Sequence, residues 1–141
     1  MRWIKIGGDQ QPSDDSSVSE DGTGGKGHGT CMLSKVAGDV YGVAKKVNPV
    51  LVRVPRFANK ENWLDGLSAI TDDLGARSDR GAKSVLSMSF YYPPDQVSPA
   101  WVRMARIHLR WHASQGILPV TGSGNTGDVS HKLGILYRFR D

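Results

Sequence analysis

The sequence predicts an α/β fold built around a parallel sheet. Stretches rich in β-branched residues alternate along the chain with stretches of helical period, and no hairpin signal separates consecutive strands. In such an alternation each helix crosses between parallel strands, and the crossovers are right-handed. The 141 residues correspond to about one domain at roughly 100 to 200 residues per domain.

The strands are predicted from β-branched runs and their boundaries. The clearest is PVLVRVP, which is bounded by prolines, and the last runs directly into a glycine-rich turn. The expected strands are residues 3–6, 49–55, 84–90 and 117–121.

The helices are predicted from apolar period and from capping residues. Asn59 and Ser98 are suitable N-caps, and glycines follow each periodic stretch. The expected helices are residues 31–37, 59–75 and 98–114. Residues 7–29, rich in Gly, Ser and Asp, are expected to form a loop, and residues 128–141 a tail without clear period.

Composition excludes several classes of protein. No apolar run approaches the roughly 18 to 20 residues of a membrane span, and residues 1–9 lack the apolar segment of a secretory signal. The single cysteine cannot form an internal disulfide or a multi-cysteine zinc site. A net charge of +4 is too small to predict nucleic-acid binding, so neither nucleic acid nor membrane is an expected partner.

His28 is the first candidate for chemistry, because it stands between Gly27 and Gly29 at the start of a predicted helix. Glycines allow a ligand to approach the backbone closely, and the positive end of a helix favours the neutral imidazole that a general base requires. A solvated loop histidine is the simpler interpretation of this motif taken alone.

Asn125 is the second candidate, within GSGNTG after the last predicted strand. Glycine-rich turns at the carboxyl ends of parallel strands bind ligands in open α/β sheets. An asparagine there can donate its side-chain amide to a developing oxyanion. A tight turn is the alternative, and the stretch lacks the Lys-Ser/Thr ending of a P-loop.

Taken together, these segments resemble the subtilases. GHGTCMLSKVAGDVYGVAKKVNPVLVRVP resembles the family's histidine segment, AKSVLSMSF its V-I-N-M-S-L-G strand, and ILPVTGSGNTG the segment with the oxyanion asparagine. The resemblance covers about residues 24–127 and is nearest the fungal branch. It implies a serine endopeptidase with a three-layer parallel-sheet core, here truncated at both ends.

The resemblance also implies roles for individual residues. His28 would be the general base and Asn125 the oxyanion donor. The segment that would pair with a polypeptide substrate as an added strand is Ser89, Phe90 and Tyr91, and one wall of the specificity pocket is Gly122, Ser123 and Gly124. No cofactor or metal ion is implied. Family members are mostly secreted, and the sequence itself predicts no location.

Two boxes of the family are absent from the 141 residues. No aspartate is followed by Ser/Thr-Gly some thirty residues before His28, and no G-T-S-x-A-x-P follows Asn125. In addition, Tyr91 replaces a residue that is usually glycine in the family. The chain alone is therefore predicted to be inactive, with the missing segments of the same domain as possible partners. A truncated gene model and a non-catalytic peptide-binding module are the alternatives.

Three further features have simpler interpretations. Cys31 could be a nucleophile, but a buried, inert thiol is favoured. His108 and His112 have the i, i+4 spacing of a zinc helix without the Glu of H-E-x-x-H, so two histidines packed on one face, with water or backbone partners, are expected. The stripe Arg103, Arg106 and Arg110 is interpreted as a solvated face.

Overall fold

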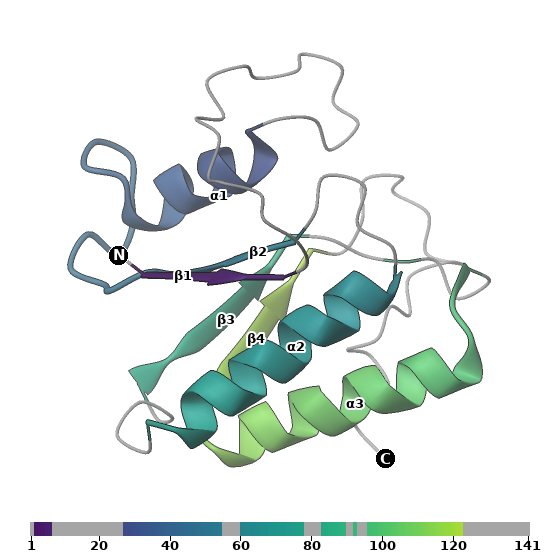
Figure 1. Ribbon diagram of the computed structural model, residues 1–141. Coiled ribbons are helices and arrows are strands. Elements are labelled where there is room, and N and C mark those ends of the chain that lie inside the picture. The colour runs from purple at the N-terminus through teal and green to yellow at the C-terminus, as the bar shows by residue number, and fades with distance from the viewer. Residues whose placement is uncertain are drawn as a thin grey trace. The chain divides into compact units, whose positions relative to one another are not determined.

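The computed structural model describes residues 2–6, 27–54, 60–77, 83–89, 92 and 96–122. The chain divides into two compact units, Met1–Phe57 and Ala58–Asp141. Their described elements, labelled in Figure 1, are β1 (Arg2–Lys5), α1 (His28–Ala37), β2 (Val50–Arg53), α2 (Lys60–Gly75), β3 (Val85–Met88), α3 (Pro99–Ser114) and β4 (Leu118–Thr121).

The first unit pairs its two strands in parallel. The register runs from Arg2 opposite Val50 to Lys5 opposite Arg53. The amide of Ile6 extends the pairing by donating to the carbonyl of Arg53 at 2.9 Å. Because α1 lies between β1 and β2 in the chain, this unit has the order strand, helix, strand that the sequence predicts.

Helix α1 begins three residues earlier than predicted, at His28 rather than Cys31. Gly27 makes this start possible, since its φ of 92° lies in the left-handed region that favours glycine. The helix ends at Ala37 as expected, and Gly38 is extended. A Cβ on Gly38 would lie 2.5 Å from the carbonyl oxygen of Ser34, so close approach explains this glycine.

The second unit also pairs two parallel strands, β3 and β4, from Val85 opposite Leu118 to Met88 opposite Thr121. Helices α2 and α3 pack against each other and against this pair (Figure 1). The buried core consists of Leu67, Met88, Trp101, Ala105 and Leu109. One face of β3 and β4 is therefore covered, whereas Val85 and Leu118 are 66% and 61% exposed.

The caps of α3 confirm the predicted boundaries. The hydroxyl of Ser98 accepts from the amide of Trp101 at 3.1 Å, and Pro99 occupies the first turn, where its missing N–H costs no hydrogen bond. Gly116 follows the helix with a φ of 77°, and the buried Ile117 leads into β4. Helix α2 begins at Lys60, and its predicted cap Asn59 lies outside the described residues.

Helices joined to small parallel sheets place the chain in the α/β class. Strands β2, β3 and β4 each have four residues, and each is shorter than the strand predicted from the sequence. Within the described ranges, no helix is long and apolar enough to cross a membrane.

Candidate functional site

His28 occupies the first turn of α1. The carbonyl of Gly27 accepts from the amide of Cys31 at 2.8 Å, which closes this turn, and no side chain caps the helix. The His28 side chain is exposed, and none of the residues of α1 is fully buried. The imidazole therefore stands at an accessible helix start, where a substrate could reach it.

Ser89 and Gly122 come directly after β3 and β4. Because Met88 is opposite Thr121, the two strands end at the same edge of the sheet. The amide of Gly122 donates to the carbonyl of Met88 at 3.3 Å, and a Cβ on Gly122 would meet no atom of the described residues within 4 Å. The carboxyl edge that the sequence predicts as a ligand site thus has an exposed serine and an open glycine side by side.

The structure brings Ser89 and Gly122 together within the second unit, while His28 belongs to the first. The other predicted site residues, Phe90, Tyr91, Ser123, Gly124 and Asn125, lie outside the described residues. The meeting of His28 and Asn125 around one substrate carbonyl stays a prediction.

Cys31 is exposed, which corrects its interpretation as a buried thiol. It lies three residues after His28, so the two side chains share one side of α1. Its carbonyl accepts from the hydroxyl of Ser34 at 2.7 Å, and that contact involves the backbone and not the sulfur. The thiol is accessible because α1 exposes this side.

His108 and His112 share one face of α3, as predicted, but their partner is a side chain of α2 rather than water or backbone. The hydroxyl of Thr71 lies 3.0 Å from Nδ1 of His108 and 3.0 Å from Nε2 of His112. It also lies 3.0 Å from the carbonyl oxygen of Leu67. Since a hydroxyl donates once and accepts twice, it donates to Leu67 and accepts one N–H from each imidazole. Thr71 was not predicted as a partner, although a threonine four residues after Leu67 in a helix with an apolar face was a signal in the sequence.

His112 is neutral at physiological pH. Its side chain is 0% exposed, and burial, followed by the charge of His108, lowers its pKa from 6.5 to about 4. Its Nδ1 is buried and has no hydrogen-bond partner among the described residues, so none of them stabilises an added proton there. The described residues include no group of three or more His, Cys, Asp or Glu that could hold a metal ion. This histidine pair is therefore a structural contact between two helices.

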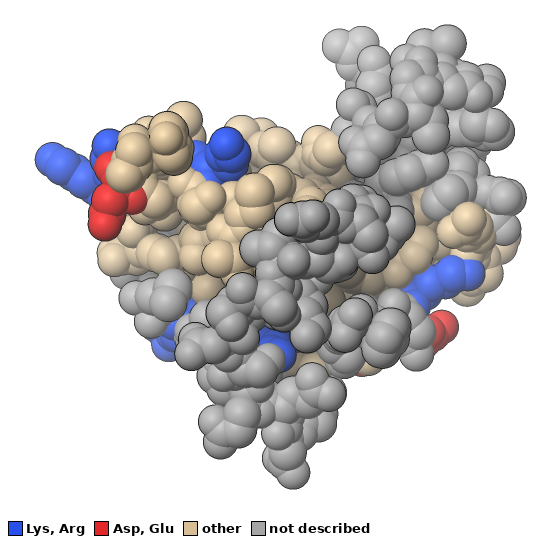
Figure 2. Space-filling model, turned by 90° about the horizontal axis from the view of Figure 1, so that it is seen from above, with Lys and Arg blue, Asp and Glu red and all other residues tan. Residues whose placement is uncertain are grey.

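The predicted solvated stripe is only partly solvated. Arg103 and Arg110 are exposed, whereas Arg106 is half-buried and its Nε has no hydrogen-bond partner in the part of the chain that the structure describes. Figure 2 shows some of the described Lys and Arg side chains, in blue, at the surface.

Comparison with known proteins gives one partial match. Over 69 residues the chain is 45% identical to "Subtilisin-like proteinase Mp1" of Magnaporthiopsis poae. The alignment covers 45% of this chain and 17% of that protein, so the chain spans less than a fifth of the relative's length. No protein-family model matches the chain, and no solved structure matches it. The match supports a relation to subtilisin-like proteinases over part of the chain.

Proposed function

We propose that this chain is part of a subtilisin-like serine endopeptidase with a three-layer, parallel-sheet α/β core. The observation that carries the proposal is the 45% identity over 69 residues to a subtilisin-like proteinase. The order of the histidine and asparagine motifs, 97 residues apart, supports it, as do the parallel strands that precede the asparagine motif.

In this proposal His28 is the general base. Its imidazole takes the proton from the nucleophilic hydroxyl and returns it to the leaving amine. Exposure at the first turn of α1 supports the role, because a base must reach the proton that it removes. A lone imidazole cannot perform the reaction, since the nucleophile and the orienting carboxylate are absent from these 141 residues.

Asn125 is the proposed oxyanion donor, three residues beyond Gly122 at the carboxyl edge of β4. Its amide would donate to the tetrahedral intermediate. The segment proposed to pair with the substrate is Ser89, Phe90 and Tyr91, and the pocket wall is Gly122, Ser123 and Gly124. The place of Gly122 directly after β4, at the same edge of the sheet as Ser89, supports this assignment.

The 141 residues alone are not expected to hydrolyse peptides. In subtilisin, loss of the nucleophilic serine alone lowers kcat by about 10⁶. The chain would retain the histidine segment and the substrate edge, and the rest of the same domain would supply the missing groups.

A chimera tests the proposal. Residues 24–127 replace the corresponding segment of the proteinase from Magnaporthiopsis poae, and hydrolysis of a peptide substrate is measured. We expect activity, a loss of about 10⁶ in kcat on His28→Ala, and a loss of about 10² to 10³ on Asn125→Ala. These magnitudes are the ones measured in subtilisin.

Cys31→Ser is the matched control, because the thiol is exposed on the same helix. Unchanged activity is expected, whereas its loss would indicate a cysteine nucleophile. A chimera that remains fully active after His28→Ala would overturn the assignment of the base.

The second candidate is a peptide-binding module without turnover. The shared edge of β3 and β4 at Ser89 and Gly122, where an extended peptide could pair, favours it. It predicts measurable affinity of the 141-residue chain for peptides, together with a chimera that folds but does not hydrolyse. Titration of the chain with a labelled peptide library, together with the activity of the chimera, distinguishes the peptide-binding module from the part of an endopeptidase.

A further inference from the structure

Helices α2 and α3 of the second unit lie side by side and run in the same direction (Figure 1). Near their beginnings, Nε1 of Trp101 donates to the carbonyl of Lys60 at 2.8 Å. Near their ends, Thr71 contacts His108 and His112. These contacts fix which residues of the two helices stand at the same height.

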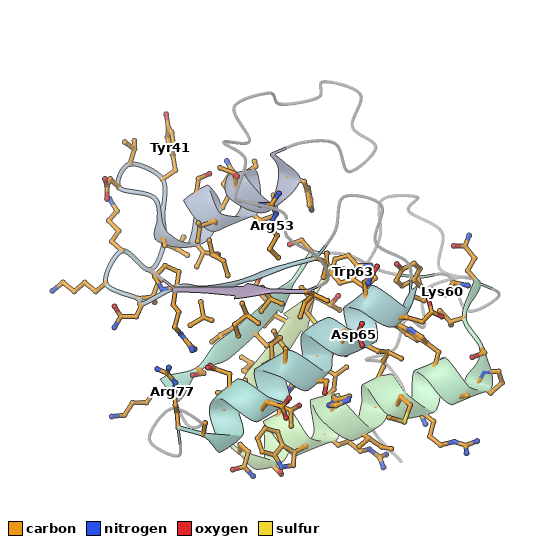
Figure 3. The ribbon with its side chains drawn as sticks, in the orientation of Figure 1. Tyr41, Arg53, Lys60, Trp63, Asp65 and Arg77 are labelled. Carbon is orange, nitrogen blue, oxygen red and sulfur yellow. The ribbon has the colours of Figure 1, made fainter. Side chains whose placement is uncertain are left out.

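The exposed face of α2 is acidic. Glu61, Asp65 and Asp72 are all exposed, and their spacings of four and seven residues place them in one stripe along the helix. Figure 3 labels Asp65 in the middle of α2, with Lys60 at its beginning and Arg77 just beyond its end. The α2 residues that contact α3, such as Thr71, lie on another side of the helix.

The exposed face of α3 carries the opposite charge, because this helix contains no Asp or Glu. Successive residues of a helix are turned by 100° about its axis. Around the exposed side of α3, from the side that contacts α2 to the opposite side, the order is Met104, then Ile107, then Arg103 with Arg110. Met104 and Ile107 are 45% and 54% exposed, and both arginines are exposed. Across the two helices the surface therefore has an acidic band, an apolar band and a basic band.

This order is self-complementary. A two-fold axis that is parallel to the helices and runs over the apolar band exchanges the outer bands and keeps the height along the helices. The contacts between α2 and α3 place Arg103 level with the segment from Glu61 to Asp65, and Arg110 level with Asp72. The charges of two copies would thus match in position as well as in sign.

We propose that the chain forms a two-fold homodimer through the exposed face of α2 and α3. Arg103 of each copy lies opposite Glu61 and Asp65 of the other, and Arg110 lies opposite Asp72. Met104 and Ile107 of both copies meet at the centre and exclude water there, which strengthens the surrounding ion pairs.

Sedimentation equilibrium of the 141-residue chain over a range of concentrations tests the dimer. We expect the mass to rise from 15.3 kDa toward twice that value, and the association to weaken roughly tenfold between about 0.05 and 0.5 M NaCl, because exposed charges are screened. A mass that stays at one chain throughout, or monomers that bind anionic vesicles instead, contradicts the proposal.

Two charge-reversed variants sharpen the test. R103E/R110E and D65K/D72K each place like charges opposite one another, so each alone should dimerise at least about 100-fold more weakly. In an equimolar mixture the reversed charges of one variant meet the reversed charges of the other, and only the unchanged Glu61 faces the R103E side chain, so the heterodimer should recover most of the wild-type affinity. Homodimers of either variant, or a mixture that remains monomeric, would overturn the two-fold arrangement.

K83E is the matched control, since it reverses an exposed lysine of the same unit that belongs to neither α2 nor α3. It should dimerise as the wild type does. M104E, which changes the apolar centre, should weaken association at all salt concentrations, and circular dichroism verifies that each variant keeps its helices.

Discussion

Helices α1 and α3 each carry histidines, and their surroundings are opposite. His28 is exposed on a helix that has no fully buried residue, and the segment that follows α1 exposes Tyr41 and Val43 at 78% and 89%. His112 is 0% exposed in a unit with a buried apolar core. A substrate could therefore reach His28, whereas the buried His112 and the half-buried His108 join α3 to α2 through Thr71.

The largest effect on stability is expected from Trp101→Ala. Trp101 is 6% exposed, contacts the ring of Tyr92 edge-on at 5.7 Å, and donates to the carbonyl of Lys60. Its truncation should lower the free energy of unfolding of the second unit by about 3 to 5 kcal/mol in urea titrations followed by circular dichroism. A loss below about 1 kcal/mol would show that the core does not depend on this ring.

Acid is the next largest perturbation. The unfolded chain binds a proton at His112 below pH 6.5, whereas the folded chain resists it down to about pH 4. Stability is therefore complete above pH 6.5 and falls by about 3 kcal/mol as the pH decreases to 4.

His112→Leu isolates this contribution, because it removes the titrating group from the same buried position. Between pH 6.5 and 4, the free energy of unfolding of the variant should fall less with decreasing pH than that of the wild type. Urea denaturation curves at several pH values measure this difference. An unchanged slope would assign the acid sensitivity to other groups.

Thr71→Val tests the contact between the helices. The change removes the hydroxyl oxygen that accepts from both imidazoles and leaves the N–H of the buried His112 without this acceptor, so we expect a loss of about 1 to 3 kcal/mol. Thr71→Ser keeps the hydroxyl and is the matched control. Equal losses for the two variants would mean that packing of the methyl group, and not the hydrogen bonds, decides stability.

The smallest effect is expected in the first unit. Val43→Ser should change the free energy of unfolding by no more than about 0.5 kcal/mol, since Val43 is exposed and only its backbone amide bonds to Lys35. Hydrogen exchange of the α1 amides measures this change. A loss of stability above about 0.5 kcal/mol would contradict the contrast between the two units.

Much of the fold could be predicted because its signals are local. Ser98 and Pro99 indicate the start of α3. Glycines indicate the ends of helices, and β-branched runs indicate the strands. The early start of α1 was missed because it depends on a left-handed φ at Gly27, which a glycine permits but does not require.

The partner of the histidine pair could not be predicted, because it depends on contacts between distant segments. Thr71 is 37 residues from His108 and 41 from His112, and only the packing of α2 on α3 brings them together. Similarly, the exposure of Cys31 follows from what covers α1, which no local pattern reveals. In the candidate site, the residue types and their order could be predicted from sequence motifs. The register of β3 and β4, which places Ser89 beside Gly122, could be seen only in the structure.

The most direct test of the proposed function is a crystal structure of the active chimera with a peptidyl boronate bound. The account predicts the His28 imidazole and the Asn125 amide both within about 3 Å of the tetrahedral adduct, on opposite sides of the same boron. If the two side chains lie in separate parts of the molecule, with the inhibitor contacting neither or only one of them, the shared site does not exist.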